Sequence, residues 1–255
     1  MKIAITGAAG GIGSEASEIL EEKGHEVLAV DRDEKGLDEL DVTSCFCFDI
    51  TDENAVQDFV ENNEFEVLVN CAGYQEAGSI EDMPSEVIEQ MYEDNVFGLL
   101  NMTRSSLPML REKSGRVVNV SSIAGRATVS FYGIYSATKF SVEAISDALR
   151  GEVREYDVDV VIVEPGYINT GFNVRGLEAV KKYMPDSIYS GSYEKRLDRG
   201  GLPGTNSKKA GKKVAKAVLS SRPKRRYTIT WLAWLAPKLK RFLPRRVFYA
   251  LTDRA

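Results

Sequence analysis

The sequence predicts an α/β fold, a single doubly wound domain in which helices cover both faces of a parallel seven-stranded sheet. Short runs rich in Val and Ile alternate along the chain with longer amphipathic segments. These runs are almost continuously apolar, as expected of strands that are buried on both faces. The 255 residues and 43% hydrophobic composition suffice for one large domain with its own core. Strand–helix alternation then implies right-handed crossovers between parallel strands.

Seven apolar runs are predicted to be strands: residues 2–6, 26–30, 45–48, 66–70, 116–120, 159–163 and 226–230. Five segments between them are predicted to be helices: residues 12–23, 53–62, 85–111, 133–156 and 208–220. The stretch 171–206 differs, because it is dotted with glycine and only weakly periodic. Long irregular segments of compact domains usually form lids or binding loops, so we expect a substrate lid here. We expect residues 1–255 to form one domain that carries this lid and a basic amphipathic C-terminal segment, residues 228–255.

The formal net charge of −5 combines two unlike parts of the chain. Residues 207–255 contain 15 Lys and Arg against one acid, Asp253, a balance of +14. Residues 1–206 contain 18 bases against 37 acids, a balance of −19. No run of about 18 apolar residues occurs, so no transmembrane helix is expected. The first residues lack a signal-peptide pattern, which makes a cytoplasmic location the expectation.

Two residue counts narrow the possible chemistry. The only histidine is His25, so a Ser-His-Asp triad is not expected unless that residue reaches the site. The three cysteines, Cys45, Cys47 and Cys71, form no Cys-x-x-Cys pair, and no metal site is expected. We expect them to be buried free thiols.

The first predicted strand runs into a glycine-rich turn. Gly7, Gly11 and Gly13 have the spacing Gly-x-x-x-Gly-x-Gly between that strand and the next helix. Glycines let backbone N–H groups approach a ligand closely, and a helix N-terminus attracts a pyrophosphate. We interpret the turn as a dinucleotide-binding turn, although a glycine cluster can also be purely structural.

Asp31 and Arg32 follow the second predicted strand, where an acidic side chain can bind the ribose 2′-hydroxyl of a dinucleotide. The Asp31 carboxylate would repel a 2′-phosphate, which favours NAD as the cofactor. Arg32 could offset that repulsion, so NADP is the alternative cofactor. A solvated Asp31 with no ligand is also open.

Tyr135 and Lys139 lie four residues apart in a predicted helix and therefore share one of its faces. A phenol with a pKa of about 10 is a poor base at neutral pH, but a nearby ammonium group lowers that pKa. Such a pair suits general acid–base catalysis, although the spacing also arises by chance. Tyr132 has no lysine four residues after it.

The sequence also contains Asn70-Cys71-Ala72-Gly73, Asn95, Ser121-Ser122 and Pro165-Gly166. In this order, over residues 1 to 170, the motifs resemble the short-chain dehydrogenase/reductase family. The C-terminal third is similar to its steroid and retinol dehydrogenase-like branch. The resemblance implies a Rossmann-type domain, an NAD(P)-dependent oxidoreductase acting on CH–OH groups, and a homodimer or homotetramer. A non-catalytic cofactor-binding regulator or scaffold is the alternative, although such a relative would be expected to lack Ser122, Tyr135 or Lys139.

The resemblance also implies residue roles. Tyr135 corresponds to the general acid/base, Lys139 to the residue that lowers its pKa and holds the nicotinamide ribose, and Ser122 to the serine that hydrogen-bonds the substrate oxygen. Asn95 corresponds to an asparagine that supports a water-mediated proton relay. Asp49 is expected at the adenine and Thr170 at the carboxamide, while Asn70 can instead be structural. The full set of implied cofactor contacts is Gly7, Gly11, Ile12, Gly13, Asp31, Arg32, Asp49, Ile50, Asn70, Ala72, Gly73, Tyr135, Lys139, Pro165, Gly166, Ile168 and Thr170.

Two further segments bear on partners. Apolar residues of the predicted lid, among them Phe172 and Met184, favour a small apolar alcohol or ketone as the substrate. The mixture of Trp, Leu and bases in 228–255 is typical of an interfacial membrane helix, but Pro237 and Pro244 are expected to break it into short pieces. The segment could instead cover the lid or a partner subunit. Peripheral membrane contact is thus open, and no nucleic acid is expected as a partner.

Overall fold

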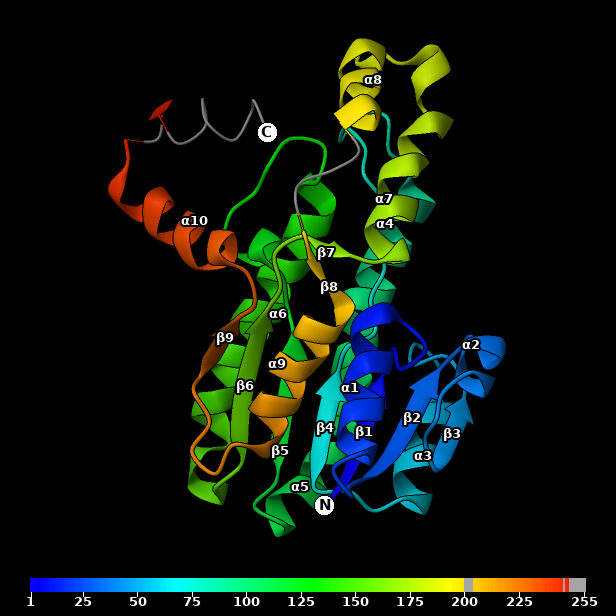
Figure 1. Ribbon diagram of the computed structural model, residues 1–255, viewed down its shortest axis with the longest axis vertical. Coiled ribbons are helices and arrows are strands. Elements are labelled where there is room, and N and C mark those ends of the chain that lie inside the picture. The colour runs from blue at the N-terminus through cyan, green and yellow to red at the C-terminus, as the bar shows by residue number, and fades with distance from the viewer. Residues whose placement is uncertain (200–203, 245, 248–255) are drawn as a thin grey trace.

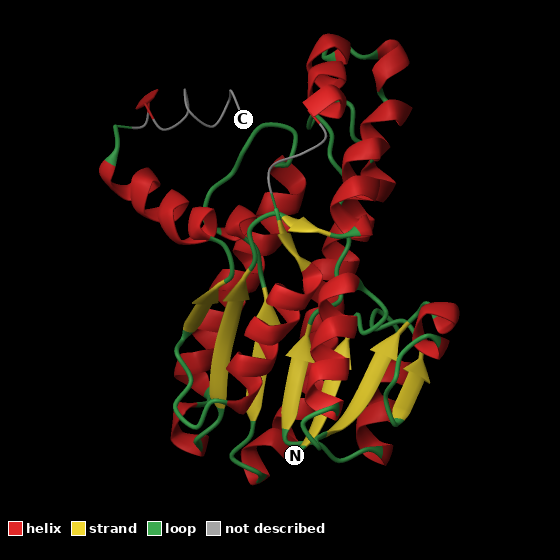
Figure 2. Ribbon diagram, viewed as in Figure 1, coloured by secondary structure: helices red, strands yellow, loops and turns green. Residues whose placement is uncertain are grey.

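The computed structural model describes residues 1–199, 204–244 and 246–247. Its main sheet contains seven strands, all parallel, in the order β3-β2-β1-β4-β5-β6-β9 (Figures 1 and 2). The predicted α/β fold class with a parallel seven-stranded sheet is therefore confirmed. The strands of this sheet are β1 (Lys2–Thr6), β2 (Glu26–Asp31), β3 (Ser44–Cys47), β4 (Val67–Asn70), β5 (Arg116–Val120), β6 (Asp159–Glu164) and β9 (Arg226–Thr228).

Helices cover both faces of the sheet, and each face has its own hydrophobic core. On one face, α1 (Gly11–Glu21) and α9 (Ser207–Leu219) pack over strand side chains such as Ile3 and Ile5. On the other face, α3 (Glu53–Asn62), α5 (Gly98–Glu112) and α6 (Gly133–Glu152) pack over Ala4 and Leu68. The strand order reverses at β1, which lies between β2 and β4. Such a reversal opens a crevice at the carboxyl ends of the strands.

Three helical regions differ from the sequence expectation. The segment expected as one helix, 85–111, is two helices, α4 (Ser85–Tyr92) and α5, joined by a π-helical turn, η1 (Glu93–Phe97). The helix expected at 133–156 is α6, which ends at Glu152 and is followed by a 3₁₀ turn, η3 (Arg154–Tyr156). A short helix, α2 (Glu34–Asp38), was not expected; the Asp33 side chain caps it by accepting a hydrogen bond from the Gly36 N–H.

Residues 171–199, which we call the helical excursion, are not irregular as expected. They form α7 (Gly171–Glu178), η4 (Ala179–Lys182), η5 (Met184–Asp186) and α8 (Ser190–Arg199), which stand beyond the carboxyl ends of the strands (Figure 1). Each of these helices is too short to show a clear helical period of apolar residues in the sequence. They pack around the fully buried Tyr193. The two-residue strands β7 (Ile168–Asn169) and β8 (Thr205–Asn206) pair at its base. Residues 200–203 of the expected lid lie outside the described residues.

The C-terminal segment contains one helix, α10 (Trp231–Phe242), that runs through Pro237. The expected break at Pro237 is therefore wrong. A proline removes only one backbone hydrogen bond from the helix. The Thr230 side chain caps the start of α10 by accepting a hydrogen bond from the Ala233 N–H at 3.2 Å, which supports the helix. The helix does end before Pro244, because Leu243 is extended, as a residue before proline prefers. Residues 245 and 248–255 of the expected segment lie outside the described residues. Among the described helices, none has the length and apolar character needed to cross a membrane.

The cysteines differ from the expectation in one respect. All three are free thiols, but Cys71 is half-buried, and Cys45 and Cys47, which share one face of β3 as expected, are exposed rather than buried. Cys45 and Cys47 are exposed because β3, among the described strands, lies at the edge of the sheet and pairs with β2 alone.

Candidate active site

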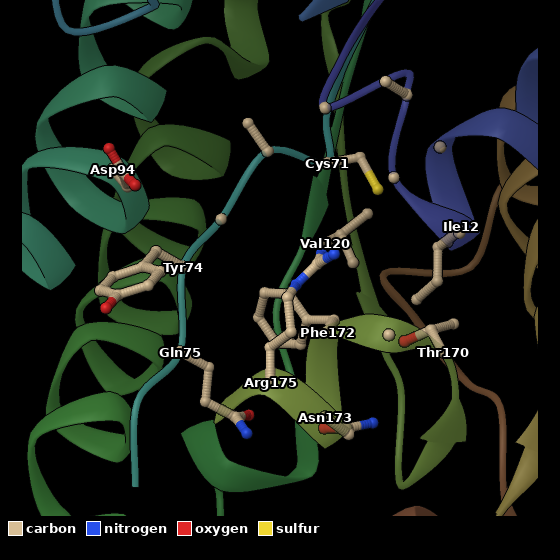
Figure 3. Close-up of a pocket in the computed structure, with 18 of the residues that line it drawn as sticks. Ile12, Cys71, Tyr74, Gln75, Asp94, Val120, Thr170, Phe172, Asn173 and Arg175 are labelled. Carbon is tan, nitrogen blue, oxygen red and sulfur yellow. The ribbon is translucent and has the colours of Figure 1, made fainter. Parts of the chain in front are cut away.

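A cavity of about 860 Å³ lies in the crevice at the carboxyl ends of the strands. Figure 3 shows its walls: Ile12 from the glycine turn, Cys71 and Val120 from the ends of β4 and β5, and Phe172 and Arg175 from α7. The sheet thus supplies one side of the cavity and the helical excursion supplies the other.

The glycine turn is shaped to bring backbone close to this cavity. Gly7 has a φ of +67°, and a Cβ there would lie 2.6 Å from the Ala72 Cα. A Cβ at Gly13 would lie 2.1 Å from the Gly7 carbonyl oxygen. Only glycine fits these two positions. Because no side chain separates them, the N-terminus of α1 packs against the turn, and its first N–H groups lie at the cavity. This cradle fits a pyrophosphate.

The end of β2 places a carboxylate and a guanidinium at one end of the cavity. Asp31 accepts hydrogen bonds from the backbone N–H groups of Ala9, at 2.9 Å, and Asp33, at 3.1 Å. Arg32 donates two hydrogen bonds to Asp94, at 3.2 and 3.0 Å, and one to Asp49, at 3.1 Å. Burial raises the pKa of the Asp94 carboxyl above its usual range, although Arg32 acts in the opposite direction. The Arg32 guanidinium is therefore already engaged by two carboxylates.

Tyr135 and Lys139 lie one turn apart on α6 and are both almost completely buried. The Lys139 Nζ is 5.9 Å from the centre of the Tyr135 ring and donates to the Val120 carbonyl at 3.2 Å. Ser122 begins a 3₁₀ turn, η2 (Ile123–Gly125), and accepts from the Ala124 N–H at 3.1 Å. All three side chains line the cavity.

The electrostatics of this group differ from the sequence expectation. Burial raises the pKa of Tyr135 to about 12, while its interaction with the Ser122 hydroxyl acts in the opposite direction. Burial lowers the pKa of Lys139 to about 8. Desolvation thus dominates at Tyr135, and Lys139, whose ammonium group donates to the Val120 carbonyl, does not bring the pKa of the phenol below its usual value.

Two expected site residues lie behind the cavity wall. Asn95, in η1, accepts from the Tyr74 N–H at 2.9 Å and donates to the Tyr74 carbonyl at 2.8 Å. It lies near Lys139, because a Cβ at Gly73 would be 2.8 Å from the Asn95 Oδ1 and 3.5 Å from the Lys139 Nζ. Asn70 is buried and donates to Thr103 and Asn119, a structural arrangement.

The other expected residues all line the cavity: Gly7, Gly11, Ile12, Gly13, Asp31, Arg32, Asp49, Ile50, Ala72, Gly73, Ser122, Tyr135, Lys139, Pro165, Gly166, Ile168 and Thr170. Sequence reasoning missed Asp94, Glu76, Arg175 and Lys182, which line it as well. Asp94 precedes Asn95 directly, but nothing in the sequence pairs it with Arg32, 62 residues away.

Glu76 connects the loop after β4 to the helical excursion. Its buried carboxylate accepts hydrogen bonds from the hydroxyls of Tyr74 and Tyr183, and the Lys182 Nζ lies 3.4 Å away. Burial alone would raise the pKa of Glu76, but the hydrogen bonds from Tyr183 and Tyr74 and the charge of Lys182 outweigh it and lower the pKa. This end of the cavity is more polar than the apolar lid that the sequence predicts.

A doubly wound parallel sheet with a glycine turn and a buried Tyr–Lys pair in one crevice defines the dehydrogenase/reductase class of protein. Comparison with known proteins supports this class: the family model described as short chain dehydrogenase matches residues 1–180. The probable short-chain type dehydrogenase/reductase VdlC of Helicobacter pylori is 34% identical, with 94% of this chain and 92% of the relative covered. The 3-ketodihydrosphingosine reductase of Bacteroides thetaiotaomicron is 32% identical, with 98% of each chain covered.

Among solved structures, a short chain dehydrogenase from Burkholderia cenocepacia in complex with NADP has the same fold. Its TM-score is 0.80 at 23% identity, with 98% of this chain and 96% of that chain covered. The chain belongs to the short-chain dehydrogenase/reductase family and is an oxidoreductase.

Proposed function

We propose that this protein is an NAD-dependent dehydrogenase/reductase that interconverts an alcohol and a ketone or aldehyde on a mainly apolar substrate, with Tyr135 as the general acid/base. The observation that carries the proposal is the burial of Tyr135 and Lys139 beside Ser122 in the crevice that the glycine turn also lines. A phenol, an ammonium group and a hydroxyl on one cavity wall can bind and protonate a carbonyl oxygen.

A bound nicotinamide cofactor would supply or accept the hydride. In reduction, the Tyr135 hydroxyl donates its proton to the substrate oxygen, while the Ser122 hydroxyl donates a hydrogen bond to the same atom and orients it. In oxidation, the Tyr135 phenolate takes that proton. Lys139 stabilises the phenolate by its charge. Asn95, which lies near Lys139, holds the Tyr74 backbone in place through two hydrogen bonds.

The preference for NAD rests on the two side chains at the end of β2. The Asp31 carboxylate is fixed by two backbone N–H groups at the end of β2, and an acidic side chain at such a position can accept a hydrogen bond from a ribose 2′-hydroxyl. Arg32, which could attract a 2′-phosphate, is bound instead by Asp94 and Asp49. This pairing supports NAD over NADP.

For the substrate, we propose a molecule with an apolar body whose polar end meets the excursion. Ile168, Phe172 and Ala179 offer apolar contacts, while Arg175 and Lys182 offer charges. The relative named a 3-ketodihydrosphingosine reductase supports a ketone as the reducible group. In this proposal residues 171–206 act as the substrate lid.

The test is the replacement Tyr135→Phe, which removes the hydroxyl and keeps the ring. We expect turnover of a ketone panel with NADH to fall by about 10²–10⁴-fold while NADH binding, measured by fluorescence titration, is retained. Tyr132→Phe, three residues earlier and without a lysine four residues on, is the matched control and keeps full turnover. Undiminished turnover in Tyr135→Phe rejects the mechanism. A folded wild-type chain that binds NADH but turns over no member of the panel supports the scaffold alternative.

The pH dependence of alcohol oxidation tests the role of Lys139. Oxidation needs the phenolate of Tyr135, so kcat/KM rises with pH at saturating cofactor. Bound NAD⁺ would add a positive charge beside Tyr135 and lower its pKa into the range where Lys139 is still protonated. Lys139→Met would then remove a second positive charge that favours the phenolate, so we expect the rise to move to higher pH. An unchanged profile would show that Lys139 has no influence on the Tyr135 pKa.

A further inference from the structure

The helix α10 exposes an unusual mixture of side chains. Trp231 and Trp234 are 73% and 54% exposed, and Phe242 is 78% exposed. Together with Lys238 and Arg241 they fall at positions i, i+3, i+7, i+10 and i+11 of one helix, which places all five on one face. We call this face the α10 stripe. The helix α10 lies at the end of the molecule where the helical excursion also stands (Figure 1).

The opposite face of α10 is held by the body of the protein. Ala233 is buried there. The Lys240 Nζ donates to the Arg126 carbonyl at 3.2 Å and lies 5.0 Å from the centre of the Phe140 ring. The α10 stripe is therefore the exposed side of a helix whose other side packs against the body of the protein.

On the stripe itself, apolar rings and positive charges are interleaved. The Lys238 Nζ lies 3.3 Å from the centre of the Trp234 ring, a cation–π contact at the surface. Tryptophan rings prefer the boundary between water and lipid, and Lys and Arg are attracted to anionic headgroups. A single stripe thus combines both requirements of an interfacial helix.

We propose that the α10 stripe docks on the surface of an anionic lipid bilayer, with the helix lying in the plane of the headgroups. The charge distribution supports this occupant, because residues 228–255, the segment that contains α10, hold six Lys and Arg against one acid. An anionic surface attracts this segment and repels residues 1–206, which carry a balance of −19, and so favours an orientation with α10 towards the lipid. A second copy fits less well, since a symmetric contact would place Lys238 and Arg241 against like charges.

The chain carries its own probe for this contact. Its two tryptophans are Trp231 and Trp234, so tryptophan emission reports on α10 alone. We expect vesicles of phosphatidylcholine with phosphatidylglycerol to shift the emission of the full chain to shorter wavelength and to protect it from acrylamide. Vesicles of phosphatidylcholine alone have little effect, and added salt weakens the response. The readout involves no turnover, so it is independent of the proposed oxidoreductase function.

Charge reversal separates the stripe from general basic charge. The double variant K238E/R241E keeps both tryptophans, and we expect its affinity for the anionic vesicles to fall at least about tenfold. The matched control K212E/K216E makes the same change in net charge on exposed positions of α9 and retains binding. Urea unfolding verifies that both variants are folded.

Three results would overturn the proposal. The first is no emission shift with anionic vesicles, or an equal shift with neutral ones. The second is an equal loss of binding in K212E/K216E, which would mean that overall charge and not the stripe is responsible. The third is an emission shift on raising the protein concentration without lipid, which would assign the stripe to contact between copies of this chain.

Discussion

The crevice at the strand ends and the helices that stand beyond it are built in different ways. In the crevice, Tyr135 and Lys139 are buried on α6, and the glycine turn is fixed by backbone contacts that admit no side chain. In the helical excursion and α10, large apolar side chains such as Ile188 and Trp231 are exposed. The proposed catalytic groups thus lie on a firmly packed frame, whereas the elements that we propose to contact the substrate and a lipid surface expose large apolar side chains.

The largest expected effect tests this difference in stability directly. Ile5 in the central strand β1 is completely buried, whereas Ile188 in the excursion is 82% exposed. Ile5→Ala deletes buried methyl groups and leaves a cavity, so we expect the free energy of unfolding to fall by about 2–5 kcal/mol. The same replacement at Ile188 should change it by less than about 0.5 kcal/mol.

Urea unfolding of the two variants measures both values. Equal losses would remove the contrast between the regions and would mean that Ile188 is covered in solution. A loss of unfolding free energy in Ile5→Ala alone supports the contrast between the firmly packed crevice and the exposed helices.

A smaller effect is expected inside the crevice, where we propose that the ion pairs of Arg32 favour NAD over NADP. Asp94 is buried and holds Arg32 through two hydrogen bonds. In Asp94→Asn the guanidinium loses this charge partner and becomes available to a 2′-phosphate, so we expect the ratio of the NADPH and NADH Kd values to move towards NADPH by about tenfold. Fluorescence titration with each reduced cofactor measures the ratio.

The control for this prediction is Asp94→Glu, which keeps the negative charge and should leave the ratio closer to that of the wild-type protein. If Asp94→Asn leaves the ratio unchanged, Arg32 does not contribute to the choice of cofactor. In that case Asp31 alone would account for a preference for NAD.

The sequence predicts a region well where its structure depends on residues close together in the chain, and poorly where it depends on contacts between distant residues. The strands were predictable because burial on both faces produces continuous apolar runs, such as residues 67–69 of β4, whatever the neighbouring strands are. The residues that end these strands meet at one edge of a parallel sheet, which is why nearly all the expected site residues share one cavity. By contrast, the short helices of the excursion pack around Tyr193. That arrangement depends on contacts between distant residues, which leave no periodic pattern of apolar residues in the sequence.

The same reasoning explains which side chains were missed. Arg32 and Asp94 are 62 residues apart, and Glu76 and Tyr183 are 107 apart. Neither pair belongs to one helix face or one strand, so no spacing in the sequence indicates it. The proximity of Tyr135 and Lys139 was predictable because it arises within one helix, whereas their pKa values were not, since these depend on burial by the whole fold.

The smallest expected effect lies in the contact between the two regions. Glu76 accepts hydrogen bonds from Tyr74, on the crevice side, and from Tyr183, in the excursion, and it pairs with Lys182. Its pKa is lowered in the folded protein, so its contribution is present above the unfolded pKa and is lost as the pH falls through the folded value. Glu76→Gln therefore reproduces at neutral pH the loosening that acid causes in the wild-type protein.

Because the amide oxygen can still accept a hydrogen bond, we expect a local cost of only about 1 kcal/mol, or about fivefold faster amide hydrogen exchange in residues 176–199. The free energy of global unfolding should stay nearly constant, since the sheet does not depend on this contact. Glu81→Gln is the matched control, because Glu81 accepts from Tyr189 of the same excursion at 3.1 Å but is exposed, and it should not change the exchange. Faster exchange throughout the sheet in Glu76→Gln would instead mean that the excursion and the crevice unfold as one unit, and the contrast between a rigid frame and loosely held helices would not stand.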